Sequence, residues 1–121
     1  MAFFERFVYK KTGHQVQEIG TECLQTLDPS TLIATRPFLN SERFERKKRR
    51  RGAANIPHVV SIADSNYLVD GHHKTRRAIE AGATEIECVV LFTNNEKIER
   101  ELKKANHGLI VNLQITQSQN I

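Results

Sequence analysis

Six consecutive residues, Val69-Asp70-Gly71-His72-His73-Lys74, have the types and spacing of an anion-binding turn. An apolar run ends at Asp70-Gly71 and a helical pattern follows, so the turn leads from a strand into a helix. The first N–H groups of a helix lack carbonyl partners within it, and their partial positive charge favours an anion. Gly71 permits close approach of the backbone, while Lys74 and the two histidines add donors. We therefore expect a phosphate group at the amides of His72 to Thr75.

Asp70, His72 and His73 are the candidate catalytic residues of this turn. An aspartate before a helix commonly caps it by accepting hydrogen bonds from the first amides, so a structural and a catalytic role for Asp70 both stay open. Either histidine can donate to a phosphate or act as a general acid. Adjacent helical residues point about 100° apart, so the two histidines cannot easily share one metal ion. No metal site is expected, because the other histidines show no ligand spacing.

A hairpin and a crossover should position the turn. The extended segment 58–62 follows a proline and turns into the strand 67–69, which leads directly to the site. The apolar, β-branched run 86–92 predicts another strand. Because a helix lies between these two strands, the order from 67 to 92 favours a right-handed parallel crossover.

The helix after Gly71 should have one buried face and one wet face. Thr75, Ala78 and Ile79 share one side at i, i+3 and i+4. The opposite side should face water, and Gly82 should end the helix. The residues assigned to the wet side are Arg76, Arg77 and Glu80.

The remaining elements follow from local patterns. Alternating runs at 6–10 and 15–19 predict an N-terminal hairpin, and Asp28-Pro29 predicts a short helix to about Ala34. Asn40 or Ser41 should cap a basic helix that ends near Gly52. A capping box at 93–96 should start a final helix that ends at Gly108, with the apolar stripe Ile98, Leu102 and Ala105.

Composition indicates one soluble globular domain, and the predicted strands and helices make it α/β in type. The chain has 121 residues, of which 39% are hydrophobic and 26% charged, as in ordinary globular domains. No stretch approaches the roughly 20 apolar residues of a membrane span, and the N-terminus lacks a secretion signal, so we expect a cytoplasmic protein without a membrane partner. Cys23 and Cys88 have no C-x-x-C spacing and are expected to be core thiols.

Positive charge is concentrated in residues 43–51, which carry seven bases and one acid in a chain of net charge +4. Such a cluster attracts polyanions through a salt-sensitive interaction, although Lys and Arg also serve as the solvated face of a helix. We favour contact with nucleic acid. The candidate residues are Arg46, Lys47, Lys48, Arg49, Arg50 and Arg51.

The string from Leu68 to Lys74, followed by Arg76, Ala78, Gly82 and the strand 86–91, resembles the signature of the ParB/sulfiredoxin superfamily. Upstream, Thr35-Arg36-Pro37, a helix to Gly52 and a strand led by Pro57 follow the order of that family, so the resemblance covers roughly residues 32–92. It implies a small mixed sheet with helices packed on it.

The resemblance also implies a phosphate-binding role for Gly71, His72, His73 and Lys74, with Arg36 reaching in from the preceding segment. In that family the turn holds nucleotide phosphates, which makes cytidine or adenosine triphosphate, with Mg²⁺, the candidate cofactors. Lys74 stands where arginine is usual. Lysine keeps the charge but loses the planar bidentate fork, so the geometry for a pyrophosphate becomes looser.

The activities of the family can be tested residue by residue. Sulfiredoxin chemistry needs a cysteine in the turn, where this chain has His72, so we discard it. Chromosome-partitioning members hydrolyse cytidine triphosphate and follow this domain with a helix-turn-helix that reads DNA. We do not expect that module here, so sequence-specific DNA binding loses support. Free serine kinases share the V-D-G-H-H string, which implies that Asp70 holds a metal or orients an acceptor hydroxyl. Their catalytic glutamate falls at Phe38 or Leu39 here, and Glu42 is the nearest carboxylate.

Two hypotheses therefore stay open. The chain is either a binding module for a nucleotide or nucleic acid, or a small phosphotransferase or nucleotide hydrolase that uses the same turn. A homo-oligomer is compatible with either. A carboxylate near the turn, from Glu18, Glu22 or Glu42, would favour the enzyme, and purely basic surroundings would favour the binding module.

Overall fold

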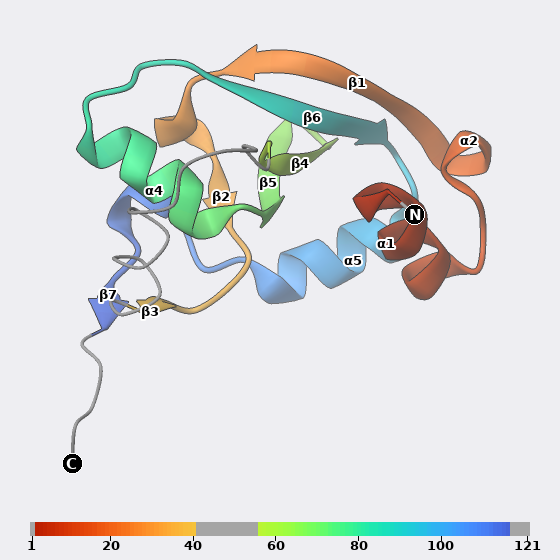
Figure 1. The fold of residues 1–121 in the computed structure, drawn as a ribbon. Coiled ribbons are helices and arrows are strands. Elements are labelled where there is room, and N and C mark those ends of the chain that lie inside the picture. Colours follow the sequence, from red (N-terminus) through yellow and green to blue (C-terminus); the bar gives the residue numbers. More distant parts are fainter. Residues whose placement is uncertain (1, 41–55, 117–121) are drawn as a thin grey trace.

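The computed structural model describes residues 2–40 and 56–116 of the chain. They form a five-stranded mixed sheet in the order β1-β6-β4-β5-β2 and a two-stranded sheet of β3 and β7 (Figure 1). The expected small mixed sheet with helices packed on it is confirmed. The strands are β1 Gly20–Leu27, β2 Ile33–Ala34, β3 Leu39–Asn40, β4 His58–Ile62, β5 Ser65–Asp70, β6 Ile86–Thr93 and β7 Ile115–Thr116. The helices are α1 Phe3–Thr12, α2 Val16–Ile19, α4 His72–Glu80 and α5 Glu96–Ala105, with 3-10 turns at Pro29–Thr31 and Ile110–Asn112.

Both faces of the sheet are covered, because consecutive strand residues contribute to different apolar clusters. Val60 packs with α1, α2 and α5, whereas its neighbour Val59 packs with the 3-10 segment around Ile110 and against Ile79 of α4. The first cluster contains Phe4, Val8, Val16, Val60, Ile62, Tyr67, Leu91, Ile98 and Leu102. The second contains Leu32, Ala34, Leu39, Val59, Leu68, Cys88, Val90, Ile110 and Leu113.

The N-terminal hairpin prediction is wrong, because residues 3–12 form helix α1 and residues 16–19 form the short helix α2. The apolar residues of α1 recur at helical spacing, and Phe4 and Val8 are fully buried. Gly13 ends α1 in the left-handed conformation and donates its amide to the carbonyl of Tyr9. The alternation at 6–10 was too short to distinguish a strand from a helix.

The hairpin of β4 and β5 is confirmed, as are helix α4 and strand β6, but the parallel crossover between β5 and β6 is wrong. Strand β6 pairs in parallel with β4, and β4 pairs antiparallel with β5, so β5 and β6 run in opposite directions. Strands β5 and β6 lie on opposite sides of β4, and helix α4 connects them. The parallel partner of β6 is therefore the first strand of the hairpin, not the second.

Three further predictions need adjustment. The helix expected from Pro29 to Ala34 is a single 3-10 turn, capped by the Asp28 carboxylate, after which the chain enters β2. Helix α5 ends at Ala105, before the predicted Gly108, and its cap is Asn95 rather than Thr93. The Thr93 hydroxyl instead accepts a hydrogen bond from the amide of Asn95. The predicted basic helix ending near Gly52 lies outside the described residues.

Replacing Asn95 with alanine should lower the free energy of unfolding by about 1 kcal/mol. The Asn95 side-chain oxygen accepts a hydrogen bond from the amide of Ile98 at 3.0 Å, and Ile98 is part of the core. Urea denaturation of the variant measures the loss. Asn94→Ala is the control, because Asn94 is exposed and the same substitution there should be nearly neutral. Equal losses in the two variants would contradict the capping role.

The two cysteines have different environments. Cys88 is fully buried in the second apolar cluster, and burial, aided by the nearby negative charge of Glu87, raises the pKa of its thiol to about 11. Cys88 is a core thiol, as predicted, whereas Cys23 on β1 is only half-buried.

None of the described helices is long and apolar enough to cross a membrane.

Candidate phosphate-binding site

The predicted anion-binding turn lies where β5 ends and α4 begins. Gly71 is the N-terminal cap residue of α4 and adopts a left-handed conformation, with φ of 90°. A Cβ atom at this position would lie 3.0 Å from the Cα atom of Pro57. Glycine is required here for two reasons, because the dihedral angle disfavours a side chain and the neighbouring backbone leaves no room for one.

A cavity of about 230 Å³ opens at this turn. It lies between the end of β2, the end of β5 and the first residues of α4. Five of the residues predicted for the site line it together, although Arg36 is far from the others in sequence. The lining residues are Thr35, Arg36, Val69, Asp70, Gly71, His72 and His73.

Lys74 and Thr75 do not line this cavity. They line a second cavity of about 230 Å³ on the other side of the α4 N-terminus, together with Ile56, Pro57, Ala78, Ile86 and Glu87. The amide of Thr75 donates to the carbonyl of Gly71 at 2.9 Å, so it is the first intrahelical donor of α4 and not a donor for an anion. The predicted set of phosphate-binding amides is therefore too long by one residue.

His72 links α4 to the end of β2. Its Nε2 atom accepts a hydrogen bond from the amide of Thr35 at 3.0 Å, and the side chain is 5% exposed. Burial lowers the pKa of His72 to about 3, and the positive charge of Arg36 contributes in the same direction. The ring is therefore neutral near pH 7, with its proton on Nδ1. A general-acid role for His72 is not compatible with this environment.

The position of Arg36 follows from two contacts made by the residue before it. Besides the bond to His72, the Thr35 hydroxyl donates to the carbonyl of Leu68 on β5 at 2.7 Å. Strand β2 itself pairs in parallel with β5. These contacts hold Thr35 at the end of β2, and so they place Arg36, the next residue, beside the N-terminus of α4, where it lines the cavity.

Asp70 does not cap α4. The cap residue is Gly71, and no side-chain cap hydrogen bond is present there. The Asp70 Oδ2 atom instead lies 3.4 Å from the Nδ1 atom of His58. This proximity follows from the hairpin register, which places His58 on β4 opposite Asp70 on β5.

His58 is a residue that sequence reasoning missed. Its ring packs against Phe3 and Phe4 of α1, with centroid distances of 4.7 and 5.2 Å. A register shift between His58 and Val59 pairs His58 with Asp70, and no local sequence pattern predicted that shift. The contact connects the N-terminal helix to the cavity.

The carboxylates that would favour an enzyme are not all near the cavity. Glu18 lies on α2, where it pairs with His14 at 2.7 Å, and Glu22 lies on β1, at the sheet edge opposite β2. Glu42 and the basic segment 46–51 lie outside the described residues. Within residues 2–40 and 56–116, Asp70 is the only carboxylate that lines the cavity, and no group of three His, Cys, Asp or Glu side chains gathers to hold a metal.

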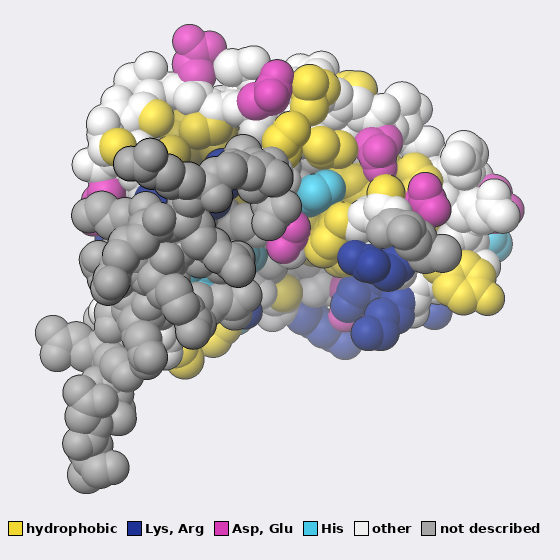
Figure 2. All heavy atoms as spheres, viewed as in Figure 1, with side chains coloured by type: hydrophobic (Ala, Val, Ile, Leu, Met, Phe, Trp, Pro, Cys, Tyr) yellow, Lys and Arg dark blue, Asp and Glu magenta, His cyan; other side chains and the backbone are white. Residues whose placement is uncertain are grey.

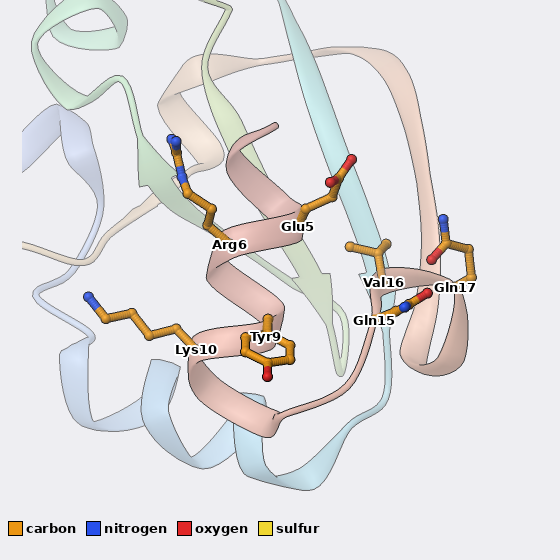
Figure 3. A pocket seen from close by; sticks show the side chains of 7 residues that line it. All are labelled: Glu5, Arg6, Tyr9, Lys10, Gln15, Val16 and Gln17. Atoms are coloured by element: carbon orange, nitrogen blue, oxygen red, sulfur yellow. The ribbon is translucent and has the colours of Figure 1, made fainter. Parts of the chain in front are cut away.

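A larger cavity, of about 650 Å³, lies between α1 and α2 (Figure 3). It contains none of the predicted site residues and is lined by Glu5, Arg6, Tyr9, Lys10, Gln15, Val16 and Gln17. Figure 2 shows Lys and Arg side chains gathered on this side of the molecule, over α1 and α5. None of its described lining residues also lines the cavity at Gly71.

No protein-family model and no curated protein sequence matches this chain. Among solved structures, the fold is similar to that of the protein Atu1540 from Agrobacterium tumefaciens, with a TM-score of 0.57 and 22% sequence identity. The similarity covers 77% of this chain and 62% of that one, so the chain spans less than two thirds of the Atu1540 length. At this identity the likeness supports the α/β fold alone.

Proposed function

We propose that this chain is a phosphate-binding module of the ParB/sulfiredoxin type, which holds a nucleotide or the backbone of a nucleic acid at the turn around Gly71. The observation that carries the proposal is the meeting of Arg36 with the N-terminus of α4 in one small cavity, lined largely by polar groups. A guanidinium and the first amides of a helix are complementary to the same anion. The string from Leu68 to Lys74 supports the same assignment.

Arg36 is the main cation of this proposed site. His72 is neutral, and Lys74 lines the other cavity, so neither supplies the charge that the sequence assigned to it. Arginine offers a planar fork that pairs with two phosphate oxygens at once. In this proposal Arg36 alone among the described residues supplies such a fork at the cavity, because Lys74 stands where arginine is usual and lines the other cavity.

The size of the cavity restricts what it would enclose. Pockets for whole small molecules are typically about 300–1,000 Å³, and this one is about 230 Å³. It would hold phosphate groups and leave the rest of a nucleotide or a nucleic-acid chain outside. Contacts to the basic residues 46–51 would add salt-sensitive affinity for nucleic acid.

A small phosphotransferase or nucleotide hydrolase is the second candidate, and the contact between Asp70 and His58 favours it. A carboxylate that lines the cavity, with an imidazole 3.4 Å behind it, can take a proton from an acceptor hydroxyl or water. Asp70 could also bind Mg²⁺ carried by cytidine or adenosine triphosphate. His73, which is buried at the same cavity, is a further candidate for proton transfer.

Isothermal titration with cytidine, adenosine and guanosine triphosphates plus Mg²⁺ should reveal saturable binding that Arg36→Ala weakens about tenfold or more, because a charged hydrogen bond is lost. Arg6→Ala is the matched control, since it removes the same charge from an exposed position on α1. A product assay run on the same samples separates the two candidates. Released diphosphate or phosphate would favour the enzyme.

Two results would overturn the proposal. One is no binding of any nucleotide and no salt-sensitive binding of nucleic acid. The other is binding that both arginine variants weaken equally, since this would indicate general charge attraction rather than a site at Arg36.

A further inference from the structure

Strand β1 is an edge strand of the main sheet. It is eight residues long and pairs with β6 in continuous antiparallel register from Gly20 to Leu27, without a bulge. No other described strand pairs with its outer side. Figure 1 shows β1 along the outer rim of the fold, with β6 beneath it. Its outward N–H and C=O groups form a template for another strand.

The opposite edge of the sheet is closed by the chain itself. Strand β2 has only two residues, and Ile33 forms a bridge with Leu109. The amide of Ala34 donates to Gly108 at 2.7 Å, and the amide of Ile110 donates to Leu32 at 2.8 Å. Within residues 2–40 and 56–116, the short edge of the sheet is covered, and the long edge at β1 pairs with no further strand.

The sequence of β1 lacks the features that usually protect an edge strand. Protected edges carry lysine, proline or bulges. The chain has 18 Lys and Arg residues, yet β1 contains none, and Glu22 is its single charged residue. At its centre, Leu24 is 53% exposed. An uncharged, regular strand with an exposed leucine is suited to pairing with another strand.

We propose that β1 pairs antiparallel with β1 of a second copy of this chain, about a two-fold axis at Leu24. The two five-stranded sheets would then form one continuous sheet across the dimer. The two copies of Leu24 would pack against each other on the face that carries α1, because Leu24 is the register partner of Val89 on that face.

The register follows from which residues would oppose each other. A two-fold axis perpendicular to the sheet keeps each face of the sheet on the same side in both copies. The axis then passes through one residue, and the residues at equal distances before and after it in sequence oppose each other across the two copies. Centred on Leu24, Glu22 opposes Thr26. Centred on Cys23, Glu22 opposes the apolar Leu24, and centred on Gln25 it opposes the carboxylate of Asp28. A carboxylate opposite a leucine gains no favourable contact, and two carboxylates opposite each other repel. The register centred on Leu24 avoids both and is therefore preferred.

The proposed dimer interface is separate from the proposed phosphate-binding site. The cavity with Arg36 and Gly71 lies at the β2 and β5 end of the sheet, away from β1. Pairing through β1 would place the two cavities at the two far ends of the joined sheet, both open to ligand. Failure of either proposal leaves the other intact.

Sedimentation equilibrium of the native chain tests the pairing. The native chain should associate to a dimer, and Leu24→Lys should raise the dimer dissociation constant about tenfold or more, because two lysines would face each other at the axis. Tyr9→Lys is the control, since Tyr9 is 67% exposed on α1 and outside the strand. Circular dichroism of each variant confirms that it is folded.

A disulfide tests the register itself. In Cys23→Ser/Leu24→Cys the new thiols of two copies would face each other at the axis, where either type of antiparallel pair has a Cα separation within disulfide range. Mild oxidation should give a covalent dimer, whereas Cys23→Ser/Tyr9→Cys should not. A native chain that remains monomeric at all concentrations, or a dimer unaffected by Leu24→Lys, would overturn the proposal.

Discussion

Replacing Gly71 with alanine should lower the free energy of unfolding by about 2–4 kcal/mol, because two costs are added at one residue. The left-handed dihedral angle, φ of 90°, is unfavourable for alanine. The new Cβ would also lie 3.0 Å from Pro57 Cα and 3.2 Å from Pro57 Cβ. The nearest atom belongs to the backbone, which cannot swing away as a long side chain would. Urea denaturation at neutral pH measures the loss.

Gly82→Ala separates the two costs. Gly82 has nearly the same dihedral angle, φ of 87°, but an added Cβ there would meet nothing within 4 Å. This control should lose only the conformational contribution, about 1 kcal/mol. If the two variants lose equal stability, the contact between Gly71 and Pro57 is not tight, and the argument that the turn requires glycine for reasons of space is wrong.

The Gly71 variant also bears on the proposed phosphate site. Movement of the turn away from Pro57 would displace the amides of His72 and His73 at the cavity. Nucleotide binding should therefore weaken in Gly71→Ala and stay unchanged in Gly82→Ala, provided that both are folded under the conditions of titration.

Elements with strong local signals were predicted correctly from sequence. The β4–β5 hairpin, α4 and β6 are delimited by Pro57, Gly71 and Gly82, and their apolar periodicity is clear over several residues. Helix α1 was missed because its apolar residues stand at helical spacing only when Phe3 and Phe4 are counted with Phe7 and Val8, and these flank the short alternation that resembled a strand.

Features that depend on tertiary contacts could not be predicted. The direction of β6 relative to β5 depends on which edge of the hairpin it joins, and no local pattern encodes that choice. Arg76 was assigned to the wet side of α4, yet its guanidinium donates to the carbonyls of Ile110 and Leu113 and so fixes the segment before β7. The charge of an arginine predicts an exposed side chain, but its long side chain can also reach backbone carbonyls and be partly buried, as Arg76 is.

The candidate site was predicted in part. Residues Asp70 to His73 are adjacent in sequence, and the resemblance added Arg36. The roles within the set were not accessible, because they depend on the bond of His72 to Thr35 and on the proximity of Asp70 to His58. Each of these contacts joins different elements of the sheet. The sequence therefore predicted a group of residues that line one cavity, while the contacts that set the state of His72 and the position of Asp70 depend on the tertiary structure.

The stability of the protein should fall by about 2 kcal/mol between pH 7 and pH 5 through His72 alone. In the unfolded chain its pKa has the ordinary value of 6.5, and in the folded protein burial lowers the pKa to about 3. The unfolded state therefore binds a proton in this range and the folded state does not. The stabilising contribution is complete above pH 6.5 and is lost progressively as the pH falls toward 3. Urea denaturation at a series of pH values measures the slope.

His72→Gln isolates this contribution, because glutamine stays neutral at every pH and its side-chain oxygen can still accept a hydrogen bond from the amide of Thr35. The difference in slope between the native protein and the variant measures the contribution of residue 72. His107→Gln, at an exposed position, is the control for the histidine-to-glutamine substitution itself. If the native protein and His72→Gln lose stability in parallel from pH 7 to pH 5, the neutral, buried state of His72 is wrong, and a general-acid role for this residue at the cavity has to be considered again.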